Sequence, residues 1–395
     1  MSLSIITTLI CIVYLFVGNS ESHAFSKESS NSSKNDTNLL KIQFDVLIVG
    51  GGPAGLSALC SLARVRHSVL LIDSGEYRNA PSRRVHDVIG SDGLHPALFR
   101  SRAREQAAQF TSAKLQNGTV RSIIRDKDNS SFITTLSSGE KYTSRKIILA
   151  TGLKDILPNV PGIEEAWGRG MYWCAWCDGW EHRDQSLGII SPLLGVINSS
   201  IQISKLNTDV IAFVNGTDTP ENRRLLGEKV PGWEKYLKLI GVKIENRTIT
   251  AFERLQDGNM FRDEKVSADY DKFRVFLEDG SNITRSSFLA SFPKVQRSYL
   301  GSDIGVQLIG EKIYVDPTNM KAAPGVWGVG DANSDNSTNV PHALYSGKKA
   351  AVSAHFELGN ENLIESLNES PITKRSESDL LNEMENGLED IWDSI

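Results

Sequence analysis

The chain has 395 residues, a length that predicts two or three domains and a core large enough to fold without metal or disulfide cross-links. Hydrophobic residues make up 40% and charged residues 23%, which is a globular composition rather than that of a disordered or multi-span membrane protein. The net charge of −5 argues against a nucleic-acid-binding surface, and four cysteines are too few for a disulfide-scaffolded fold.

The N-terminus carries an uncharged apolar run, Leu3–Val17, followed by small and polar residues suited to cleavage. The run is short for a membrane-spanning helix and predicts a secretory signal peptide over residues 1–22, with an uncleaved signal anchor as the alternative. Residues 23–42 are rich in Ser, Asn and Lys and predict a disordered linker. We therefore expect a secreted glycoprotein or a protein of the endoplasmic reticulum lumen, since Asn-x-Ser/Thr sequons lie at Asn31, Asn35, Asn117, Asn129, Asn198, Asn215, Asn246, Asn282, Asn336 and Asn368.

The first folded segment has the pattern of a strand, a turn, a helix and a second strand. Residues 44–49 form a short β-branched run, residues 50–55 are rich in glycine, and residues 56–65 have helical apolar spacing. Residues 68–73 then predict the next strand. This order is the repeating unit of a parallel sheet.

Later segments repeat the pattern. Strands are predicted at 146–150, 187–190, 209–214 and 326–329, and a helix at 343–358. The chain thus leaves one nucleotide domain, builds another and returns. The predicted fold class is α/β, with two Rossmann-like dinucleotide-binding domains, the second inserted in the first. The boundaries are 43–156 and 287–358 for the FAD-binding domain, 157–286 for the NAD(P)-binding-like domain and 359–395 for an acidic tail, which is either solvated or docks one helical face.

The glycine-rich segment satisfies the pattern GxGxxG between a strand and a helix. Gly50 permits the tight turn, Gly52 lets a pyrophosphate approach the backbone, and Gly55 allows close packing of helix on strand. Asp73 ends the following strand, where a carboxylate can bind ribose hydroxyls. The segment predicts a dinucleotide site that also includes Pro53 and Ala54.

Three further motifs resemble those of one flavoprotein family. Ala150-Thr151-Gly152 and Gly328-Val329-Gly330-Asp331 resemble the second and third flavin-contact motifs of flavoproteins with two dinucleotide domains. The segment 174–179 (CAWCDG) resembles the redox-active CxxCDG of low-molecular-weight thioredoxin reductases. The resemblance covers roughly residues 44–358 and implies FAD as cofactor, with contacts from Thr151, Gly152, Gly330 and Asp331.

Cys174 and Cys177 have the spacing of a redox-active pair, because a CxxC places two sulfurs within disulfide reach. Half a zinc site and a structural disulfide are the alternatives. Three cysteines remain after signal cleavage, so a four-cysteine zinc site is excluded and no metal is expected. The resemblance implies that Cys177 lies nearer the flavin, that Cys174 faces the substrate and that Asp178 is the acid–base group.

Two histidines and one further cysteine have open assignments. His182 is a second candidate for proton transfer or a surface imidazole in a loop. His342 either tunes the flavin and takes a substrate proton or is a helix-start residue bonded to backbone. Cys60 is predicted to be a small apolar residue buried behind the glycine loop.

The second nucleotide domain departs from the thioredoxin reductase pattern. Its expected phosphate loop reads Ser191-Pro192-Leu193-Leu194-Gly195, in which a proline removes an N–H donor and two leucines occupy the approach path. The strand at 209–214 is followed by Asn215-Gly216-Thr217-Asp218 rather than by a basic cluster. NADPH binding is therefore doubtful.

This combination resembles FAD-dependent dithiol oxidases of fungi and bacteria, such as those that close the disulfides of gliotoxin and holomycin. The segment 73–79, which includes Arg78 and Asn79, and the segment 181–185 resemble the fungal members. The resemblance implies a homodimer that oxidises a small-molecule or protein thiol, with molecular oxygen as electron acceptor. The alternatives are an NADPH-dependent disulfide reductase and a flavin-binding protein without turnover.

Overall fold

The computed structural model describes residues 41–335 and 338–369, and its compact unit begins at Lys41. The predicted signal peptide, most of the linker, the sequons at Asn31, Asn35 and Asn336, and the acidic segment from residue 370 onward lie outside the described residues. Within the described part, no helix is both long enough and apolar enough to cross a membrane.

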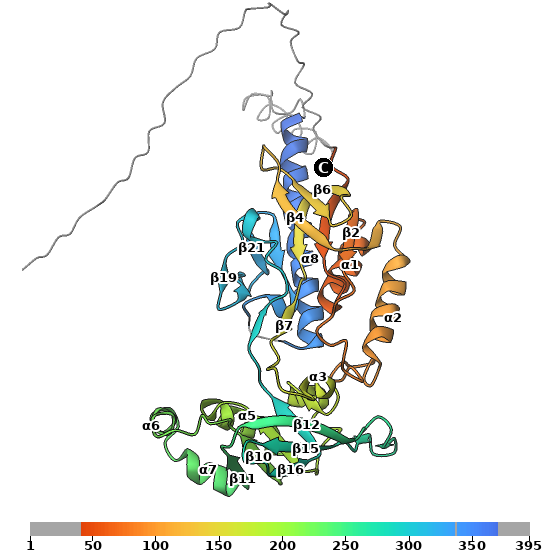
Figure 1. The fold of residues 1–395 in the computed structure, drawn as a ribbon. Coiled ribbons are helices and arrows are strands. Elements are labelled where there is room, and N and C mark those ends of the chain that lie inside the picture. The colour runs from red at the N-terminus through yellow and green to blue at the C-terminus, as the bar shows by residue number, and fades with distance from the viewer. Residues whose placement is uncertain (1–40, 336–337, 370–395) are drawn as a thin grey trace, which may run out of the picture. The chain divides into compact units, whose positions relative to one another are not determined.

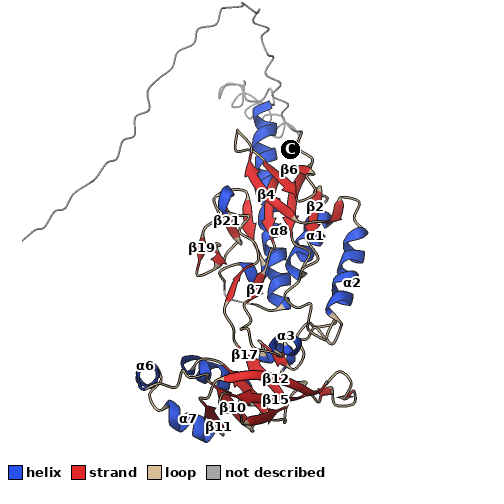
Figure 2. Ribbon diagram, viewed as in Figure 1, coloured by secondary structure: helices blue, strands red, loops and turns tan. Residues whose placement is uncertain are grey.

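The first domain is built on an eight-stranded sheet that is mostly parallel (Figures 1 and 2). Its main path runs β21-β22-β6-β1-β2-β3, and β5, which pairs with β4, is antiparallel to the N-terminal part of β6, residues 141–144. The bounds are β1 Phe44–Val49, β2 Val69–Asp73, β3 Ala113–Asn117, β4 Val120–Arg125, β5 Phe132–Leu136, β6 Lys141–Leu149, β21 Lys321–Ala323 and β22 Val326–Gly328.

Two helices cover this sheet and pack closely on one another. Helix α1 (Pro53–Arg64) links β1 to β2, and α8 (Val340–Glu369) returns from the end of β22. A Cβ atom at Gly347 of α8 would overlap the carbonyl oxygen of Ala54, so only glycine permits this approach. The continuous apolar run of β1 is buried on both faces, as expected for a central parallel strand.

The second domain is inserted between β6 and β22 and contains a five-stranded parallel sheet, in the order β11-β10-β9-β17-β8. A three-stranded antiparallel sheet, β12-β15-β16, accompanies it. The bounds are β8 Met171–Tyr172, β9 Leu187–Ile190, β10 Val210–Phe213, β11 Val242–Glu245, β12 Ile249–Gln256, β15 Lys272–Leu277, β16 Asn282–Arg285 and β17 Ser287–Ala290. The predicted fold class, α/β with one Rossmann-like domain inserted in another, is confirmed.

Two predicted boundaries differ from the structure. Strand β17 pairs with β9 in the second sheet, so the chain returns to the first domain after Ala290 and not at residue 287. Helix α8 begins at Val340 and continues through Gly359 to Glu369, so the predicted acidic tail starts within a helix. Pairing partners far along the chain decide the first boundary, and local composition does not report them.

The remaining elements are short or peripheral. The chain passes between the two domains in β7 (Leu153–Asp155) and β18 (Lys294–Gln296), which pair with each other in antiparallel fashion. The others are α2 Pro96–Ala108, α3 Ile163–Ala166, α4 Ala175–Asp178, η1 Leu193–Gly195, α5 Val196–Ile203, α6 Pro220–Lys229, α7 Trp233–Leu239, β13 Arg262–Asp263, β14 Ala268–Asp269, η2 Ser302–Ile304, β19 Leu308–Ile309, β20 Lys312–Ile313 and η3 Gly330–Ala332.

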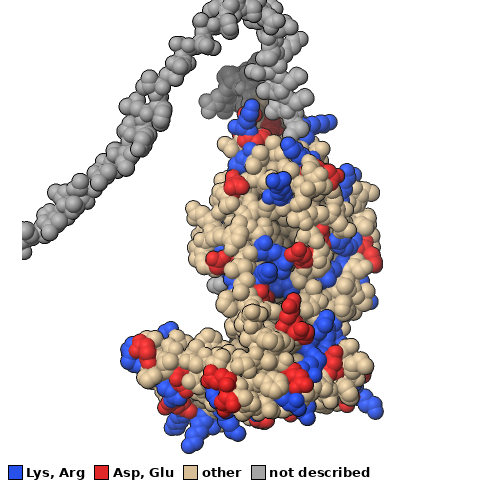
Figure 3. Space-filling view, in the orientation of Figure 1, with Lys and Arg blue, Asp and Glu red and all other residues tan. Residues whose placement is uncertain are grey.

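A buried cluster of charges joins the loop after β2 to the second domain. Arg83 forms two hydrogen bonds, of 2.7 and 2.9 Å, with the fully buried carboxylate of Asp271, and a third with Asp257. Arg254 and His182 bind the same carboxylate of Asp271. Figure 3 shows that the visible surface, in contrast, carries basic and acidic side chains side by side.

Candidate functional site

The glycine loop between β1 and α1 is shaped by close backbone contacts. Gly50 has a φ of +109°, and a Cβ there would overlap the carbonyl oxygen of Ala150. A Cβ at Gly55 would overlap the carbonyl oxygen of Gly50. The close packing of helix on strand therefore requires glycine at this position. A Cβ at Gly52, in contrast, would meet no atom within 4 Å, so the backbone there borders open space.

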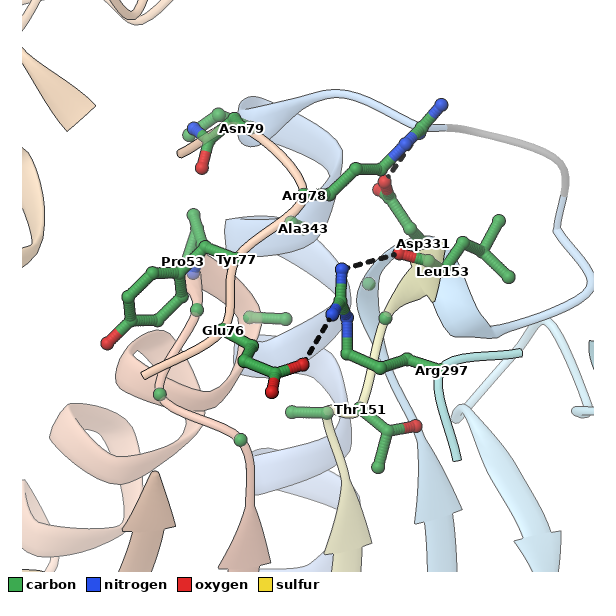
Figure 4. A pocket seen from close by; sticks show the side chains of 18 of the residues that line it. Pro53, Glu76, Tyr77, Arg78, Asn79, Thr151, Leu153, Arg297, Asp331 and Ala343 are labelled. Carbon is green, nitrogen blue, oxygen red and sulfur yellow. Dashed lines mark hydrogen bonds and ion pairs between the residues drawn. The ribbon is translucent and has the colours of Figure 1, made fainter. Parts of the chain in front are cut away.

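That open space is part of a cavity of about 370 Å³. It is bordered by the glycine loop, the end of β2, the start of β7, the segment after β18 and the start of α8. Figure 4 shows Pro53, Tyr77 and Asn79 on one side of it and Leu153 and Asp331 on the other. Of the predicted cofactor residues, Gly50, Gly52, Pro53, Ala54, Asp73, Arg78, Asn79, Thr151, Gly152, Gly330 and Asp331 line the cavity, whereas Gly55 lies behind it.

Asp73 is held ready as a hydrogen-bond acceptor at the end of β2. It accepts hydrogen bonds from the hydroxyl of Tyr77 (2.5 Å) and the N–H of Gly75 (3.0 Å), and it pairs with Arg104. Burial by itself raises the pKa of Asp73, but these donors outweigh burial and lower it. The side chain is therefore ionised at neutral pH and fits the ribose hydroxyls of a dinucleotide.

Arg78 ties together three segments of the cavity wall. Its guanidinium donates two hydrogen bonds to Asp155, of 2.7 and 2.8 Å, and one of 2.8 Å to Asp331. It also lies 5.0 Å from the ring of Trp173. Because the guanidinium is already bound to two carboxylates, its part in the cofactor site is to fix Asp331 and Trp173 in place.

Cys174 and Cys177 form a disulfide with their Cα atoms 5.2 Å apart. Cys177 and Asp178, both in α4, line the cavity, and Cys174, which precedes α4, does not. The pair therefore presents one sulfur to the cofactor cavity, while the half-buried Cys174 lies outside it.

Asp178 has an environment suited to proton transfer. Burial raises its pKa to about 6, against the opposing effects of His182 and His86. A carboxyl group with this pKa can both accept and return a proton near neutral pH.

His182 is not the surface imidazole that its turn sequence allows, because the residue is only 2% exposed. Its two ring nitrogens lie 2.9 Å from the carbonyl oxygen of Asp178 and 3.1 Å from Asp271. Burial lowers the pKa of His182, but the hydrogen bond and charge of Asp271 outweigh burial and raise it. His182 thus supports the backbone of Asp178 from behind the cavity.

His342 and Cys60 lie away from the cavity wall. The imidazole of His342 pairs with Asp335 at 2.8 Å, and its backbone N–H donates to the side chain of Asn339. Of its two predicted assignments, the structure therefore favours the helix-start residue. Cys60 is half-buried against the first core, and burial raises the pKa of its thiol.

The loop after β9 is more closely filled by the protein's own groups than the glycine loop is. The N–H of Leu193 donates to the hydroxyl of Thr217 (2.9 Å), and that of Gly195 donates to the carbonyl of Pro192 (2.8 Å). The hydroxyl of Ser191 fills the space beside Gly195, and the side chain of Leu193 is fully buried. These two N–H donors and the space beside Gly195 are thus used within the protein.

The basic residues after β10 are paired as well. Arg223 binds Asp218 and Glu234, and Arg224 binds Glu221 and Glu228. Each arginine charge is therefore already balanced on the protein surface.

Several residues of the cavity wall carry no motif and were not predicted. Trp173 stands directly before Cys174, and this position beside the CxxC was the one signal that could have identified it. His86 and Arg84 reach the cavity from the long loop between β2 and α2, and Arg297 binds Glu76 across it (2.8 Å; Figure 4). Among the described residues, no group of three or more His, Cys, Asp or Glu side chains is arranged to hold a metal ion.

Residues 44–347 match the family model described as pyridine nucleotide-disulphide oxidoreductase. The chain is 44% identical over 353 residues to a protein of Arthroderma benhamiae described as a probable thioredoxin reductase, covering 87% of this chain and 86% of that protein. It is 31% identical over 322 residues to thioredoxin reductase tcpT of Claviceps purpurea, covering 80% and 94%. The crystal structure of HlmI matches with a TM-score of 0.71 and 27% identity, covering 84% of this chain and 98% of that one.

Replacement of Gly52 by alanine tests the cofactor cradle. The added Cβ meets no protein atom, so we expect unchanged stability of the cofactor-free protein but at least a tenfold loss of FAD affinity, because the methyl group enters the space that the pyrophosphate needs. The measurement is FAD absorbance per protein after dialysis. Gly359→Ala, at an open helical site on α8, is the control and should keep its FAD; equal FAD content in the two variants would contradict the assignment.

Proposed function

We infer that this chain, which belongs to the pyridine nucleotide-disulphide oxidoreductase family, is an FAD-dependent oxidase that converts a dithiol to a disulfide, with molecular oxygen as the final electron acceptor. The family membership and the open cradle at Gly52 support FAD as the cofactor. The observation that carries the oxidase direction is the closed loop after β9, because an NADPH-dependent reductase needs that loop for phosphate.

The reaction begins at the sulfur outside the cofactor cavity. One thiolate of the substrate attacks Cys174, the bond to Cys177 breaks, and a mixed disulfide forms. The second substrate thiol then attacks the substrate sulfur of the mixed disulfide, which closes the product disulfide and releases the Cys174 thiolate. Asp178 takes up a proton released from sulfur, which its pKa of about 6 permits.

The electrons leave through the other sulfur. Cys177 lines the cavity, so its thiolate faces the cofactor, and the Cys174–Cys177 disulfide re-forms as two electrons pass on. FAD supplies the two-electron acceptor at this step. With oxygen as final acceptor, one dithiol and one oxygen molecule give one disulfide and one hydrogen peroxide.

A second candidate function is an NADPH-dependent disulfide reductase. It is favoured by the descriptions of the relatives from Arthroderma benhamiae and Claviceps purpurea, both of which are called thioredoxin reductases. In this chain, such a function requires that NADPH displace the hydrogen bond between Leu193 and Thr217 and the ion pairs of Arg223.

We also propose that the protein acts in the secretory pathway or outside the cell. The seven described sequon asparagines are all exposed, which leaves each of them room for a glycan: Asn117, Asn129, Asn198, Asn215, Asn246, Asn282 and Asn368. An oxidising compartment favours formation of disulfides over their reduction.

Reduction of the bound FAD separates the candidate functions. We expect a small dithiol such as dithiothreitol to bleach the flavin absorbance without air and to consume oxygen in air with equimolar peroxide, whereas NADPH leaves the absorbance unchanged. Cys174→Ser should keep its FAD and lose at least about 1,000-fold of the thiol-driven rate, because Cys177 alone cannot form the disulfide that the substrate thiolate attacks.

Cys60→Ser is the matched control and should react like the wild-type protein, since Cys60 lies outside the cavity. Rapid bleaching by NADPH would overturn the oxidase proposal in favour of the reductase. Failure of both reductants to bleach the flavin would favour a flavin-binding protein without turnover.

The pKa of Asp178 sets an expected pH dependence. Below about pH 6 the carboxyl group is protonated and cannot accept a proton from sulfur, so the rate of flavin reduction by dithiol should fall as the pH decreases through 6. Asp178→Asn should lower the rate about 100-fold and abolish this dependence. Exposed Asp128→Asn is the control, and an unchanged profile in Asp178→Asn would exclude Asp178 as the base.

Secretion is tested by expressing the full chain in a fungal host. We expect the protein in the culture medium, cleaved near residue 22, with a mobility that increases after treatment with an N-glycosidase. Recovery of the unglycosylated full-length chain from the cytosol would contradict the proposed compartment.

A further inference from the structure

His86 occupies a position between the cofactor cavity and solvent that no motif indicates. Its side chain is 8% exposed and lines the cavity, in the loop between β2 and α2. One ring nitrogen, Nδ1, lies 3.1 Å from the carboxylate of Asp92, which is 63% exposed. The other, Nε2, lies 3.6 Å from the buried carboxylate of Glu181, four residues after Cys177.

A second, much smaller cavity adjoins this imidazole. Asp178, Glu181 and His182 line it together with His86, and its volume of about 10 Å³ is close to what one water molecule requires. Four polar side chains around such a space supply the partners that a buried water needs. Asp178 borders both cavities, so a single water can connect its carboxyl group to the imidazole of His86.

The other charged groups around the small cavity give no exit to solvent. His182 is bonded at both ring nitrogens, and its partner Asp271 is fully buried and also bound to Arg83. Asp269 is buried and paired with Arg84. Arg83 also pairs with the exposed Asp257, but a guanidinium does not release its proton. Of the carboxylates and imidazoles that line this cavity, His86 is therefore the one with a solvent-exposed ion-pair partner, Asp92.

We propose that His86 relays to solvent the proton that Asp178 takes up when a substrate dithiol reduces the Cys174–Cys177 disulfide, an inference that rests on the reductive half of the proposed function. In that step the second substrate thiol loses its proton to Asp178, the product disulfide forms, and both cysteines are left as thiolates. When the two thiolates re-form their S–S bond, bound FAD would accept the two electrons, and the proton on Asp178 must leave before the next dithiol reacts. The imidazole accepts that proton at Nε2, through the water or Glu181, and releases it from Nδ1 to Asp92.

The charges that face His86 suit this transfer. Asp178, Glu181, Asp269 and Asp92 surround the path as carboxylates, and Arg83, Arg84 and His182 limit their combined negative charge. Burial keeps the pKa of Asp178 near 6, and His86 lowers that pKa by its charge. The two groups are therefore coupled through their charges.

The kinetic test uses the FAD-loaded full-length protein without oxygen, so it does not depend on the final electron acceptor. We expect His86→Gln to keep its FAD and to be reduced by dithiothreitol at least about tenfold more slowly, and imidazole added to His86→Ala to restore part of the rate. Asp92→Asn should also slow the reduction of the flavin by dithiothreitol. His355 is the control, because its ring pairs with His67, which follows the C-terminal end of α1 and does not line the cavity. His355→Gln should behave as wild type.

A second readout needs no turnover. In a nuclear magnetic resonance titration of histidine-labelled, oxidised protein, Asp178→Asn should lower the pKa of His86, because it removes a neighbouring negative charge. The relay would be overturned by a wild-type rate of flavin reduction in His86→Gln, or by a His86 titration that is the same in Asp178→Asn as in the wild-type protein. If dithiols fail to reduce the flavin at all, the proposed function fails and the titration still decides whether Asp178 and His86 are coupled.

Discussion

The buried carboxylate of Asp271 is the contact on which the arrangement of the site depends. Arg83 reaches it from the first domain, whereas His182 and Arg254 reach it from the second. Removal of charges from water costs several kcal/mol per ion, so the cluster is stable only while every partner stays in place. Because His182 also donates a hydrogen bond from Nδ1–H to the backbone oxygen of Asp178, the same cluster fixes α4 and keeps Cys177 at the wall of the cofactor cavity.

The two nucleotide loops of the chain show how one topology serves two purposes. Both follow the central strand of a parallel sheet and both lead into a helix. The first leaves open space at Gly52, whereas in the second the hydroxyl of Ser191 lies beside Gly195 and the N–H of Leu193 donates to Thr217. A phosphate must displace these contacts before it can bind, and each lost internal hydrogen bond costs about 1 kcal/mol.

Local sequence patterns predicted the parts of the molecule that depend on local physics. The strands β1, β2 and β9, the glycine loop and the CxxC pair have signals within a few residues. Contacts from distant segments decided the rest. His182 is buried because Asp271, eighty-nine residues away, binds its ring, and His342 turns toward Asp335. His86 lies in a loop without periodicity, so only the folded chain shows that it reaches the cavity.

If the second domain binds no nucleotide, its remaining contribution is mechanical and electrostatic. Strand β8 at the edge of its sheet leads directly into Trp173 and Cys174, and pairing with β17 holds that strand. Tyr172 at the end of β8 stacks on His182, with ring centroids 5.4 Å apart. The sheet thus supports the disulfide through Tyr172 and β8, and it contacts His182, which bonds to the backbone of Asp178. A domain with this task must keep its core and its buried carboxylates, whereas its nucleotide loop is free to change. Accordingly, Asp271 lies in a buried ionic cluster, and a bulky residue, Leu193, occupies the loop after β9.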